Sequence, residues 1–304
     1  MNVILGATGH VGSEVANILL SAGKNVRVIS RSMDRLKGFM AKGAIPFTGD
    51  IADPVFLAKA FEGADAVFTI IPPNGRADDV RKFQNTMSKS IDKALRKAGV
   101  TRVVNLSSVG AHLKGKTGPV LGLHDHEERL NKNAKLRIVH LRPGYFLENM
   151  LANIDLIKFR GVNGSALKAD TPLPFIASQD IAKTAAGYLM EGKFVGRSVR
   201  YLLGQRDLTM NELTRILGKA IGLPDLRYQQ FTYEDAERAM TTMGLSPAVA
   251  KSYVELSRAF NEGILTRTLV RTPESTTETS AETWVMEFKR LYCVDNPACQ
   301  ASGF

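Results

Sequence analysis

Short apolar runs alternate with longer segments of helical periodicity over the first half of the chain. The apolar runs have the length of strands and read NVILGA, NVRVIS, AIPFTGD, ADAVFTII, TRVVNLSS and RIVHLRP. Between them lie segments such as VGSEVANILLSAG and VRKFQNTMSKSIDKALRKAG, whose closing glycines, Gly23 and Gly99, stand where helices end. Strands that are apolar throughout and alternate with helices are typical of a parallel sheet buried on both faces. The pattern predicts an α/β fold, a doubly wound parallel sheet of the Rossmann type.

The regular alternation of short apolar runs and helical segments ends after residue 150, which predicts a second, smaller domain. Loop-forming residues come first, then SQDIAKTAAGYLME predicts a helix and SVRYLLG a further strand. Helical patterns prevail later, where Thr209 and Glu212 have the spacing of a capping box. The parts that we expect are a Rossmann domain over residues 1–150, to which 176–204 returns; a smaller, mostly helical C-terminal domain over 151–175 and 205–292; and a flexible tail over 293–304.

Three glycines, Gly6, Gly9 and Gly12, join the first strand to the first helix in the sequence GATGHVG. In such a turn, glycines allow a tight bend, a close approach of a pyrophosphate to the backbone, and close packing of helix on strand. Free N–H groups at the helix N-terminus then bind the anion, with Thr8 and His10 near the phosphates. The alternative is a turn without a ligand, but the strand and helix around it favour a dinucleotide-binding site.

The residues after the second strand indicate which nicotinamide cofactor binds. An acidic residue there accepts a hydrogen bond from a ribose 2′-hydroxyl, whereas a cation neutralises a 2′-phosphate. This chain has Ser30 and Arg31, followed by Arg35 and Lys37, and no carboxylate at the strand end. We expect NADP(H) in preference to NAD(H); the alternative is that Arg31 only caps a surface loop.

Charge and composition narrow the remaining function classes. The formal net charge is +10, and the positive excess lies in the part that contains the glycine turn, which favours an anionic ligand, although solvated helix faces explain much of it. No zinc finger, basic zipper or ribonucleoprotein motif is present, so direct nucleic-acid binding is not expected. The only cysteines, Cys293 and Cys299, provide no four-ligand metal site. With no secretory signal and no apolar run of about 18 residues, we expect a cytoplasmic protein without a membrane segment.

Further short motifs extend from the second strand to the C-terminal region. They are RS after the second strand, GD at Gly49 and Asp50, IIPP, VVNLSSVG, LRPGYFLENM, FIASQDIA, LTMNELTRILGKAIG and SAETWVMEF. Together with the glycine turn they resemble the NmrA-like group of atypical short-chain dehydrogenases/reductases, which are NAD(P)-binding Rossmann proteins. The resemblance spans most of the chain.

This resemblance implies a role for each candidate site residue. It implies a pyrophosphate loop of Gly6, Thr8, Gly9, His10, Val11 and Gly12, a 2′-phosphate contact by Arg31, and an adenine flanked by Asp50 and Ile51. Ile71, Pro72 and Pro73 would border the ribose and nicotinamide, and Pro143, Gly144, Tyr145 and Phe146 would cover the nicotinamide face, with Asn149 close by. Ser107 and Ser108 correspond to the region of the catalytic serine in typical relatives.

One departure from typical short-chain reductases concerns the proton donor. Those enzymes use a tyrosine and a lysine spaced Y-x-x-x-K, whereas the comparable segment here, GLHDHEERLNK, has no such pair. His124 and Glu128 are one helical turn apart, and His124 or His126 could donate a proton with Glu127 or Glu128 beside it. The alternative is that these are ordinary polar residues at an exposed helix start. We expect no metal site.

Two functions follow from these observations. The first is an NADPH-dependent reductase of a quinone or a related conjugated carbonyl, because a quinone can take its proton from water. Its pocket would use the C-terminal helices and residues 145–175, with Tyr145, Phe146, Phe159 and Phe175 as apolar walls. The second is a non-catalytic NADP(H) redox sensor or transcriptional regulator that acts through a regulatory protein partner. Either could be a monomer or a homodimer.

Overall fold

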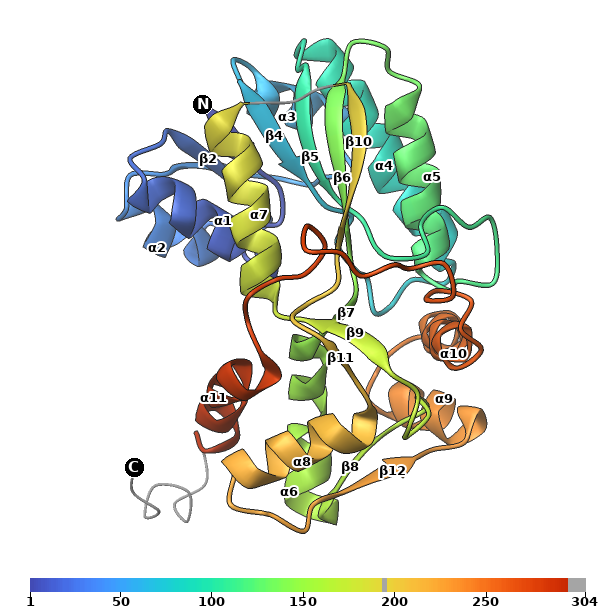
Figure 1. Cartoon of the computed structure of the whole chain (residues 1–304). Helices are drawn as coiled ribbons and strands as arrows, with labels where there is room; N and C mark the ends of the chain where they lie inside the picture. Colours follow the sequence, from blue (N-terminus) through green and yellow to red (C-terminus); the bar gives the residue numbers. More distant parts are fainter. Residues whose placement is uncertain (193–195, 295–304) are drawn as a thin grey trace.

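A parallel sheet forms the upper half of the molecule in the computed structural model, which describes residues 1–192 and 196–294 (Figure 1). Within these residues the sheet has seven strands in the order β10-β6-β5-β4-β1-β2-β3, and all neighbours pair in parallel. Their bounds are β1 Asn2–Ile4, β2 Val26–Ser30, β3 Ile45–Thr48, β4 Ala66–Thr69, β5 Arg102–Leu106, β6 Arg137–Pro143 and β10 Arg197–Leu202. The strand order reverses between β1 and β4. Doubly wound sheets bind ligands beyond the carboxyl ends of the strands at such a point.

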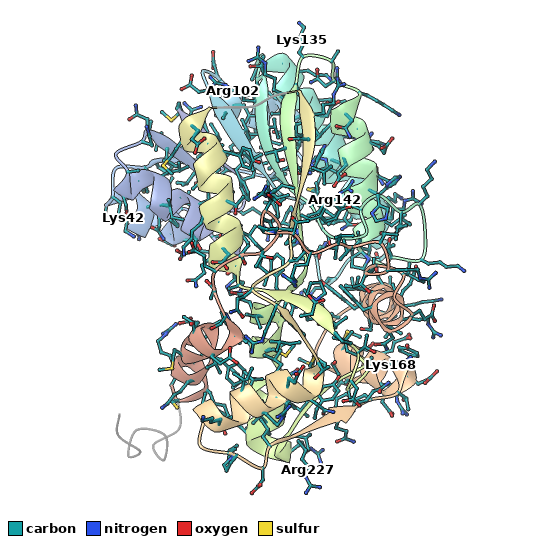
Figure 2. The ribbon with its side chains drawn as sticks, in the orientation of Figure 1. Lys42, Arg102, Lys135, Arg142, Lys168 and Arg227 are labelled. Carbon is teal, nitrogen blue, oxygen red and sulfur yellow. The ribbon has the colours of Figure 1, made fainter. Side chains whose placement is uncertain are left out.

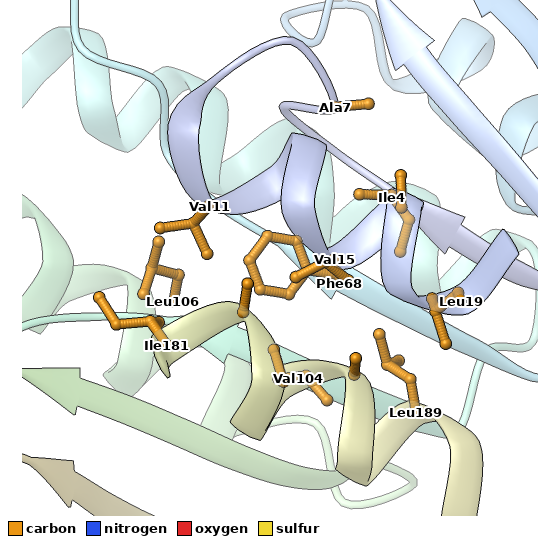
Figure 3. Packing of buried hydrophobic residues seen from close by; sticks show 14 of the residues in the cluster. Ile4, Ala7, Val11, Val15, Leu19, Phe68, Val104, Leu106, Ile181 and Leu189 are labelled. Atoms are coloured by element: carbon orange, nitrogen blue, oxygen red, sulfur yellow. The ribbon is translucent and has the colours of Figure 1, made fainter. Parts of the chain in front are cut away.

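Helices cover both faces of this sheet (Figure 1). One face carries α1 (His10–Ser21) and α7 (Ser178–Glu191), the other carries α3 (Pro54–Phe61), α4 (Val80–Lys97) and α5 (Val120–Asn131), and η1 (Asp34–Leu36) with α2 (Lys37–Met40) connects β2 to β3. Consecutive strand residues face opposite layers: Val67 and Val103 pack with α3 and α4, whereas Phe68 and Val104 pack with α1 and α7 (Figure 3). Both faces are therefore buried, which explains why the strands are apolar throughout.

The predicted helix ends are confirmed. Gly23 and Gly99 follow α1 and α4 with φ angles of +67° and +68°, a left-handed conformation that glycine adopts without strain. Thr209 and Glu212 form the reciprocal hydrogen bonds of a capping box at the start of α8 (Met210–Ala220).

The lower half of the molecule in Figure 1 is built from the C-terminal segments and surrounds its own core. Besides α8 it contains η2 (Leu147–Asn153), α6 (Ile154–Arg160), α9 (Tyr233–Thr242), α10 (Pro247–Asn261) and α11 (Ala281–Tyr292). It also contains short strands that the sequence does not predict: β7 (Tyr145–Phe146), β9 (Leu173–Ile176) and β11 (Asp207–Leu208) form one small sheet, and β8 (Val162–Ser165) pairs with β12 (Arg227–Gln230). Strands of two to four residues are too short to show an alternating pattern.

Three segments of the chain connect the halves. The chain leaves the sheet at β6 and enters η2 through β7, returns from β9 to α7 and β10, and leaves the sheet again between β10 and β11. The strand β10 pairs with β6 along six residue pairs. In the described residues, none of the helices combines the length and the apolar character that crossing a membrane requires. Most of the expected C-terminal tail, including Cys299, lies outside the described residues.

Candidate cofactor and substrate site

The glycine turn between β1 and α1 is tightly packed. Gly6 has a φ of +67°, and its backbone oxygen accepts a hydrogen bond from the Gly9 N–H at 3.0 Å. A Cβ at position 12 would lie 2.2 Å from that same oxygen, so glycine at this position lets the first turn of α1 approach the loop. The close approach of Gly12 is thus to the turn itself rather than to the strand.

Gly9 differs because the protein leaves room beside it. Its φ of −98° suits any residue, and the nearest atom to a Cβ there would be 3.5 Å away. The N–H groups of His10, Val11 and Gly12 have no acceptor among the described residues, and α1 has neither a side-chain cap nor an acidic residue in its first turn. Free donors beside open backbone fit a phosphate group.

Two arginines follow β2 close to this turn. Arg35 donates from Nη2 to the backbone oxygen of Thr8 at 2.7 Å, which ties the segment after β2 to the glycine turn. Arg31 is exposed and makes no hydrogen bond or ion pair with a described residue. Lys37 is paired with Asp34 at 2.7 Å. Arg31 is therefore available for an anion such as a 2′-phosphate.

Asp50 and Ile51 lie just beyond β3, beside the end of β2. The Asp50 carboxylate accepts a hydrogen bond from the Ala52 N–H at 2.9 Å through Oδ1, which shapes an exposed turn. Ile51 is half-buried against the core on the α3 side. These positions suit the rim of a site rather than its floor.

A cavity of about 530 Å³ opens beyond the carboxyl ends of β4 and β5. The predicted site residues that line it are Ile71, Pro72, Pro73, Ser107, Ser108, Gly144, Tyr145, Phe146 and Asn149. Pro143, at the end of β6, is buried behind this lining. The structure therefore brings together residues from three separate segments that the sequence identified singly.

The opposite wall of the cavity comes from α10, one of the C-terminal helices expected at the pocket, although the sequence did not single out its lining residues. Val249, Ser252, Tyr253, Leu256 and Phe260 contribute their side chains from successive turns. Their spacing is that of an ordinary amphipathic helix face, which gives no sign of whether it meets a core or a cavity.

The helix α10 is held against the Rossmann half at two places. Ser246, its N-cap, donates from its N–H to the Gly75 oxygen at 2.8 Å and from its hydroxyl to the Ala77 oxygen at 2.6 Å. At Gly118, which has a φ of +56°, a Cβ would lie 2.2 Å from the backbone oxygen of Ser252. These contacts fix the cavity between the two halves.

The predicted aromatic walls are only partly correct. Tyr145 and Phe146 line the cavity, and Phe175 supports Tyr145 from behind, with ring centroids 5.5 Å apart. Phe159 was expected in the same wall, and that prediction is wrong: its side chain is 80% exposed on α6. A short helix with one outward aromatic residue cannot be distinguished in sequence from one that turns it inward.

Behind Ser107 lies a buried ion pair that the sequence analysis missed. Arg142 donates from Nε to Glu127 Oε1 at 3.0 Å and from Nη2 to Glu127 Oε2, and from Nη1 to the Tyr201 hydroxyl at 3.0 Å. The Ser107 hydroxyl donates to Glu127 Oε1. Figure 2 shows Arg142 inside the upper half, whereas Lys42 and Lys135 extend to its outline. An arginine within the apolar strand RIVHLRP was the available signal, because a buried guanidinium needs a partner.

This ion pair keeps both partners charged. Burial by itself raises the pKa of Glu127, but hydrogen bonds and charge from Arg142, with smaller contributions from His140 and Ser107, hold it below its usual value. Burial also opposes the charged form of Arg142, yet its contacts with Glu127 and Tyr201 raise its pKa. The Ser107 hydroxyl proton is therefore committed to a carboxylate.

The histidines of α5 do not reach the cavity. His126 is fully buried, and its Nδ1 lies 2.8 Å from the Ser88 hydroxyl, which also accepts from Arg129 Nε. Burial, with the nearby His140 and Arg129, lowers the pKa of His126 to about 3, so it stays neutral. His126 is therefore not placed to donate a proton in the cavity, and the alternative of a polar residue at an exposed helix start does not hold for it either.

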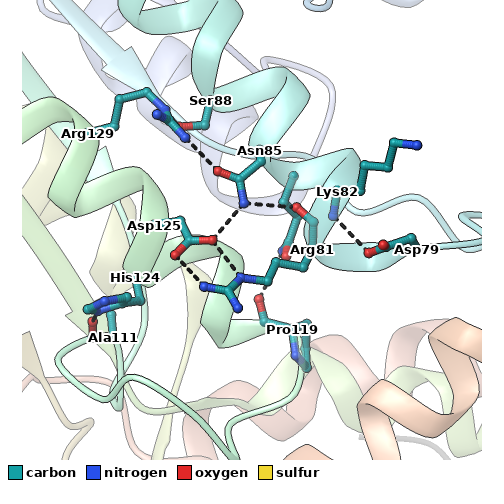
Figure 4. A network of polar contacts seen from close by, with 11 residues as sticks. Asp79, Arg81, Lys82, Asn85, Ser88, Ala111, Pro119, His124, Asp125 and Arg129 are labelled. Atoms are coloured by element: carbon teal, nitrogen blue, oxygen red, sulfur yellow. Dashed lines mark hydrogen bonds and ion pairs between the residues drawn. The ribbon is translucent and has the colours of Figure 1, made fainter.

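His124 lies on the outer side of the same helix. Its Nδ1 donates to the Ala111 oxygen at 2.8 Å, and its side chain is not part of the cavity lining (Figure 4). The neighbouring Asp125 accepts two hydrogen bonds from Arg81, at 2.7 and 2.9 Å, across the contact between α4 and α5. This arrangement gives the polar residues around His124 a role in joining two helices.

Two tyrosines, Tyr145 and Tyr253, are among the lining residues of the cavity. Burial raises the pKa of Tyr145 to about 12, with Tyr253 adding to the effect, and burial also raises the pKa of Tyr253. Both phenols are protonated near neutral pH, so each can donate a hydrogen bond. Among the described residues, no group of three or more histidine, cysteine or acidic side chains is arranged to hold a metal ion.

Two known proteins with comparable sequences are by name reductases. The chain is 26% identical to NAD(P)H azoreductase of Xenophilus azovorans over 256 residues, which cover 84% of this chain and 86% of the relative. It is 28% identical to (4-alkanoyl-5-oxo-2,5-dihydrofuran-3-yl)methyl phosphate reductase of Streptomyces griseus, over 84% of this chain and 85% of the relative.

Solved structures give the same picture of the fold. An NADPH-dependent quinone oxidoreductase of Escherichia coli, complexed with NADPH, matches with a TM-score of 0.76 at 22% identity, over 95% of this chain and 99% of that one. Triphenylmethane reductase of Citrobacter sp., complexed with NADP(H), matches with a TM-score of 0.77 at 19% identity, over 94% of this chain and 99% of that one.

The fold, the glycine turn and these similarities define an NAD(P)H-binding protein of the Rossmann class. The family of NAD(P)H-binding proteins matches over residues 6–191, from the glycine turn to the end of α7. This chain belongs to that family, and the resemblance to NmrA-like atypical short-chain dehydrogenases/reductases is confirmed.

Proposed function

We propose that the protein reduces a quinone or a related conjugated carbonyl compound by hydride transfer from NADPH. The observation that carries the proposal is the largely apolar cavity between Ile71, Pro72 and Ser107 on one side and α10 on the other. It lies beyond β4 and β5, beside the switch point where a doubly wound sheet presents its cofactor.

The residues present fit NADP(H) along one continuous path. The free N–H groups of His10, Val11 and Gly12, with Gly9 beside them, suit the pyrophosphate. Arg31 suits the 2′-phosphate and gives the preference over NAD(H), with Asp50 and Ile51 at the adenine. Ile71, Pro72, Pro73, Pro143, Tyr145 and Phe146 then border the nicotinamide. When bound, NADPH supplies the hydride.

A quinone suits a site without a tyrosine–lysine pair. Carbonyl reduction needs a positioned acid, but the Ser107 proton is committed to Glu127 and His124 lies outside the cavity. A quinone carries two conjugated oxygens, to which Tyr145 and Tyr253 can donate hydrogen bonds, and its reduced form takes protons from water. The chain's part is therefore to bind, orient and enclose the acceptor.

The comparisons support this reaction class and cofactor. Two of the relatives are by name an NAD(P)H azoreductase and a reductase of a methyl phosphate compound, and two of the similar structures hold NADPH or NADP(H). A reaction that consumes NADPH also agrees with the cytoplasmic location that we expect from the sequence.

Anaerobic mixing of the protein with NADPH and a panel of simple quinones tests the proposal. We expect cofactor oxidation well above the rate in buffer for at least part of the panel. Replacing Leu256 by Trp should fill the cavity and suppress this activity, whereas Met243→Trp, at a position 67% exposed and outside the cavity, should not. No acceleration across the panel would contradict the proposal.

A second candidate is a non-catalytic NADP(H) sensor that acts through a regulatory protein partner. The absent tyrosine–lysine pair and the committed Ser107 hydroxyl favour it. A sensor must bind the two cofactor states with different affinity, or bind a partner differently with each. Calorimetric titrations with NADP+ and NADPH that give equal affinities, with no cofactor-dependent partner, would exclude this function.

A further inference from the structure

The cavity is lined by uncharged side chains only, in a chain of which 23% of the residues are charged. We infer that this cavity selects uncharged aromatic molecules and rejects charged analogues of the same size; the inference rests on the proposed function for taking the cavity as the substrate site. No aspartate, glutamate, lysine, arginine or histidine is among its described lining residues.

The polar groups of the cavity are neutral hydrogen-bonding groups. Besides Ser107, whose hydroxyl donates to Glu127, they are the amides of Asn74, Gln84 and Asn149, the hydroxyls of Ser108 and Ser252, and the phenols of Tyr145 and Tyr253. Both phenols are protonated, as their raised pKa values require. Such groups suit a carbonyl oxygen, which accepts hydrogen bonds but carries no formal charge.

The charges behind Ser107 cancel, and those on α10 are turned away from the cavity. The carboxylate of Glu127 behind Ser107 is matched by Arg142, so the pair adds no net charge beneath the cavity. On α10, Lys251 and Glu255 are exposed and Arg258 lies over the ring of Tyr233, 4.2 Å from its centroid. None of these three contributes to the lining.

A charged ligand would lose hydration on entry without gaining a counter-charge. Burial of an ionised group without a partner is far more costly than burial of a hydrogen-bonded neutral one. The Streptomyces relative is by name a reductase of a methyl phosphate compound. The cavity in this chain offers no cation to such a phosphate, so its substrate class is different.

The test uses three redox-inert probes of equal ring size: 2-acetylnaphthalene, 2-naphthoate and 2-naphthyltrimethylammonium. Calorimetry on the full chain without cofactor measures their affinities without turnover and without the positive charge that the pyridinium ring of NADP+ would add. We expect the neutral ketone to bind about tenfold or more tightly than either ion. Equal affinity for the ketone and the carboxylate, or no binding of the ketone at millimolar concentration, would overturn the inference.

A matched pair of variants locates the effect in the cavity. Ser252→Lys adds one cation to the lining and should raise the affinity for 2-naphthoate relative to the ketone by about tenfold. Ser257→Lys makes the same change on α10 outside the lining and should leave the ratio unchanged. The same shift in both variants would contradict selection by the cavity. Selective binding of the ketone with no quinone reduction would overturn the proposed function and leave this inference standing.

Discussion

Arg142 and Glu127 form a bidentate ion pair beneath the cavity, with Arg142 Nε 3.0 Å from Glu127 Oε1. The pair joins the end of β6 to the middle of α5, and the Ser107 hydroxyl at the end of β5 completes it. Typical short-chain reductases keep their serine free for the substrate, whereas here it belongs to the support of the cavity floor.

Replacing Glu127 by Gln should destabilise the protein by about 3–5 kcal/mol, because Arg142 would remain buried without a counter-charge. Urea unfolding measures the change. Glu128→Gln, at the exposed neighbouring position, is the control and should change stability by about 0.5 kcal/mol at most. Equal effects of the two substitutions would contradict the role of the ion pair.

The contribution of Glu127 should also depend on pH in one direction. Its folded-state pKa lies below the usual value of 4.5, so the folded protein binds its proton less readily than the unfolded chain does. The stabilisation is therefore complete above about pH 4.5 and is lost as the pH falls through the lowered pKa. The stability difference between wild type and Glu127→Gln, followed by urea unfolding at several pH values, should shrink over that acidic range and stay constant above it.

Ser107→Ala should leave quinone reduction within about threefold of wild type, because the hydroxyl donates to Glu127 rather than to a substrate. The same variant should lose about 1 kcal/mol of stability with that hydrogen bond. Steady-state rates and urea unfolding separate the two effects. A loss of activity of about a hundredfold or more would instead identify Ser107 as a catalytic residue.

Arg31→Ala should weaken NADPH binding by about tenfold to a hundredfold and change NADH binding little, because a charge-assisted contact with a phosphate contributes about 1.5–3 kcal/mol. Calorimetric titration with both cofactors checks this. Lys37→Ala is the control, since Lys37 is already paired with Asp34. Equal losses for NADPH and NADH would refute the 2′-phosphate assignment.

Gly9→Ala should separate cofactor binding from stability. The protein has room for a methyl group there, with 3.5 Å to the nearest atom, so the melting temperature should stay within a few degrees of wild type. NADPH affinity should fall at least tenfold if a pyrophosphate lies against this backbone. Gly38→Ala, where an added Cβ meets nothing within 4 Å, should change neither quantity. Unchanged affinity in Gly9→Ala would remove the pyrophosphate from this turn.

The sequence predicts the main sheet well because both faces of each strand are buried and the strands are separated by helices. Val67 and Phe68 are consecutive residues that face opposite cores, so every position of this strand is apolar. Such a strand can be recognised from its own sequence, without knowledge of the strands that pair with it. The short strands β7, β9 and β11 lack that signal. They exist because their partners lie close in the folded chain, which a local pattern does not record.

The site likewise contains residues that the local sequence predicts and residues whose placement depends on tertiary packing. The glycine turn and Arg31 are local features of a strand, a turn and a helix, so their geometry can be anticipated. The wall formed by α10 and the partnership of Glu127 with Arg142 depend on how α10 and α5 pack, and nothing in their spacing specifies it. Phe159 was predicted in the cavity wall but is exposed, because the packing of α6 rather than the local sequence decides which way this side chain points.

A single-turnover experiment shows most directly whether NADPH bound to this protein reduces a quinone at the cavity. The protein is saturated with stoichiometric NADPH under anaerobic conditions and mixed rapidly with 1,4-naphthoquinone, and nicotinamide absorbance is followed. We predict that one equivalent of bound NADPH is oxidised much faster than in a mixture without protein, and that Leu256→Trp suppresses this phase. NADPH that binds yet is oxidised no faster than in buffer would contradict a reductase at this cavity.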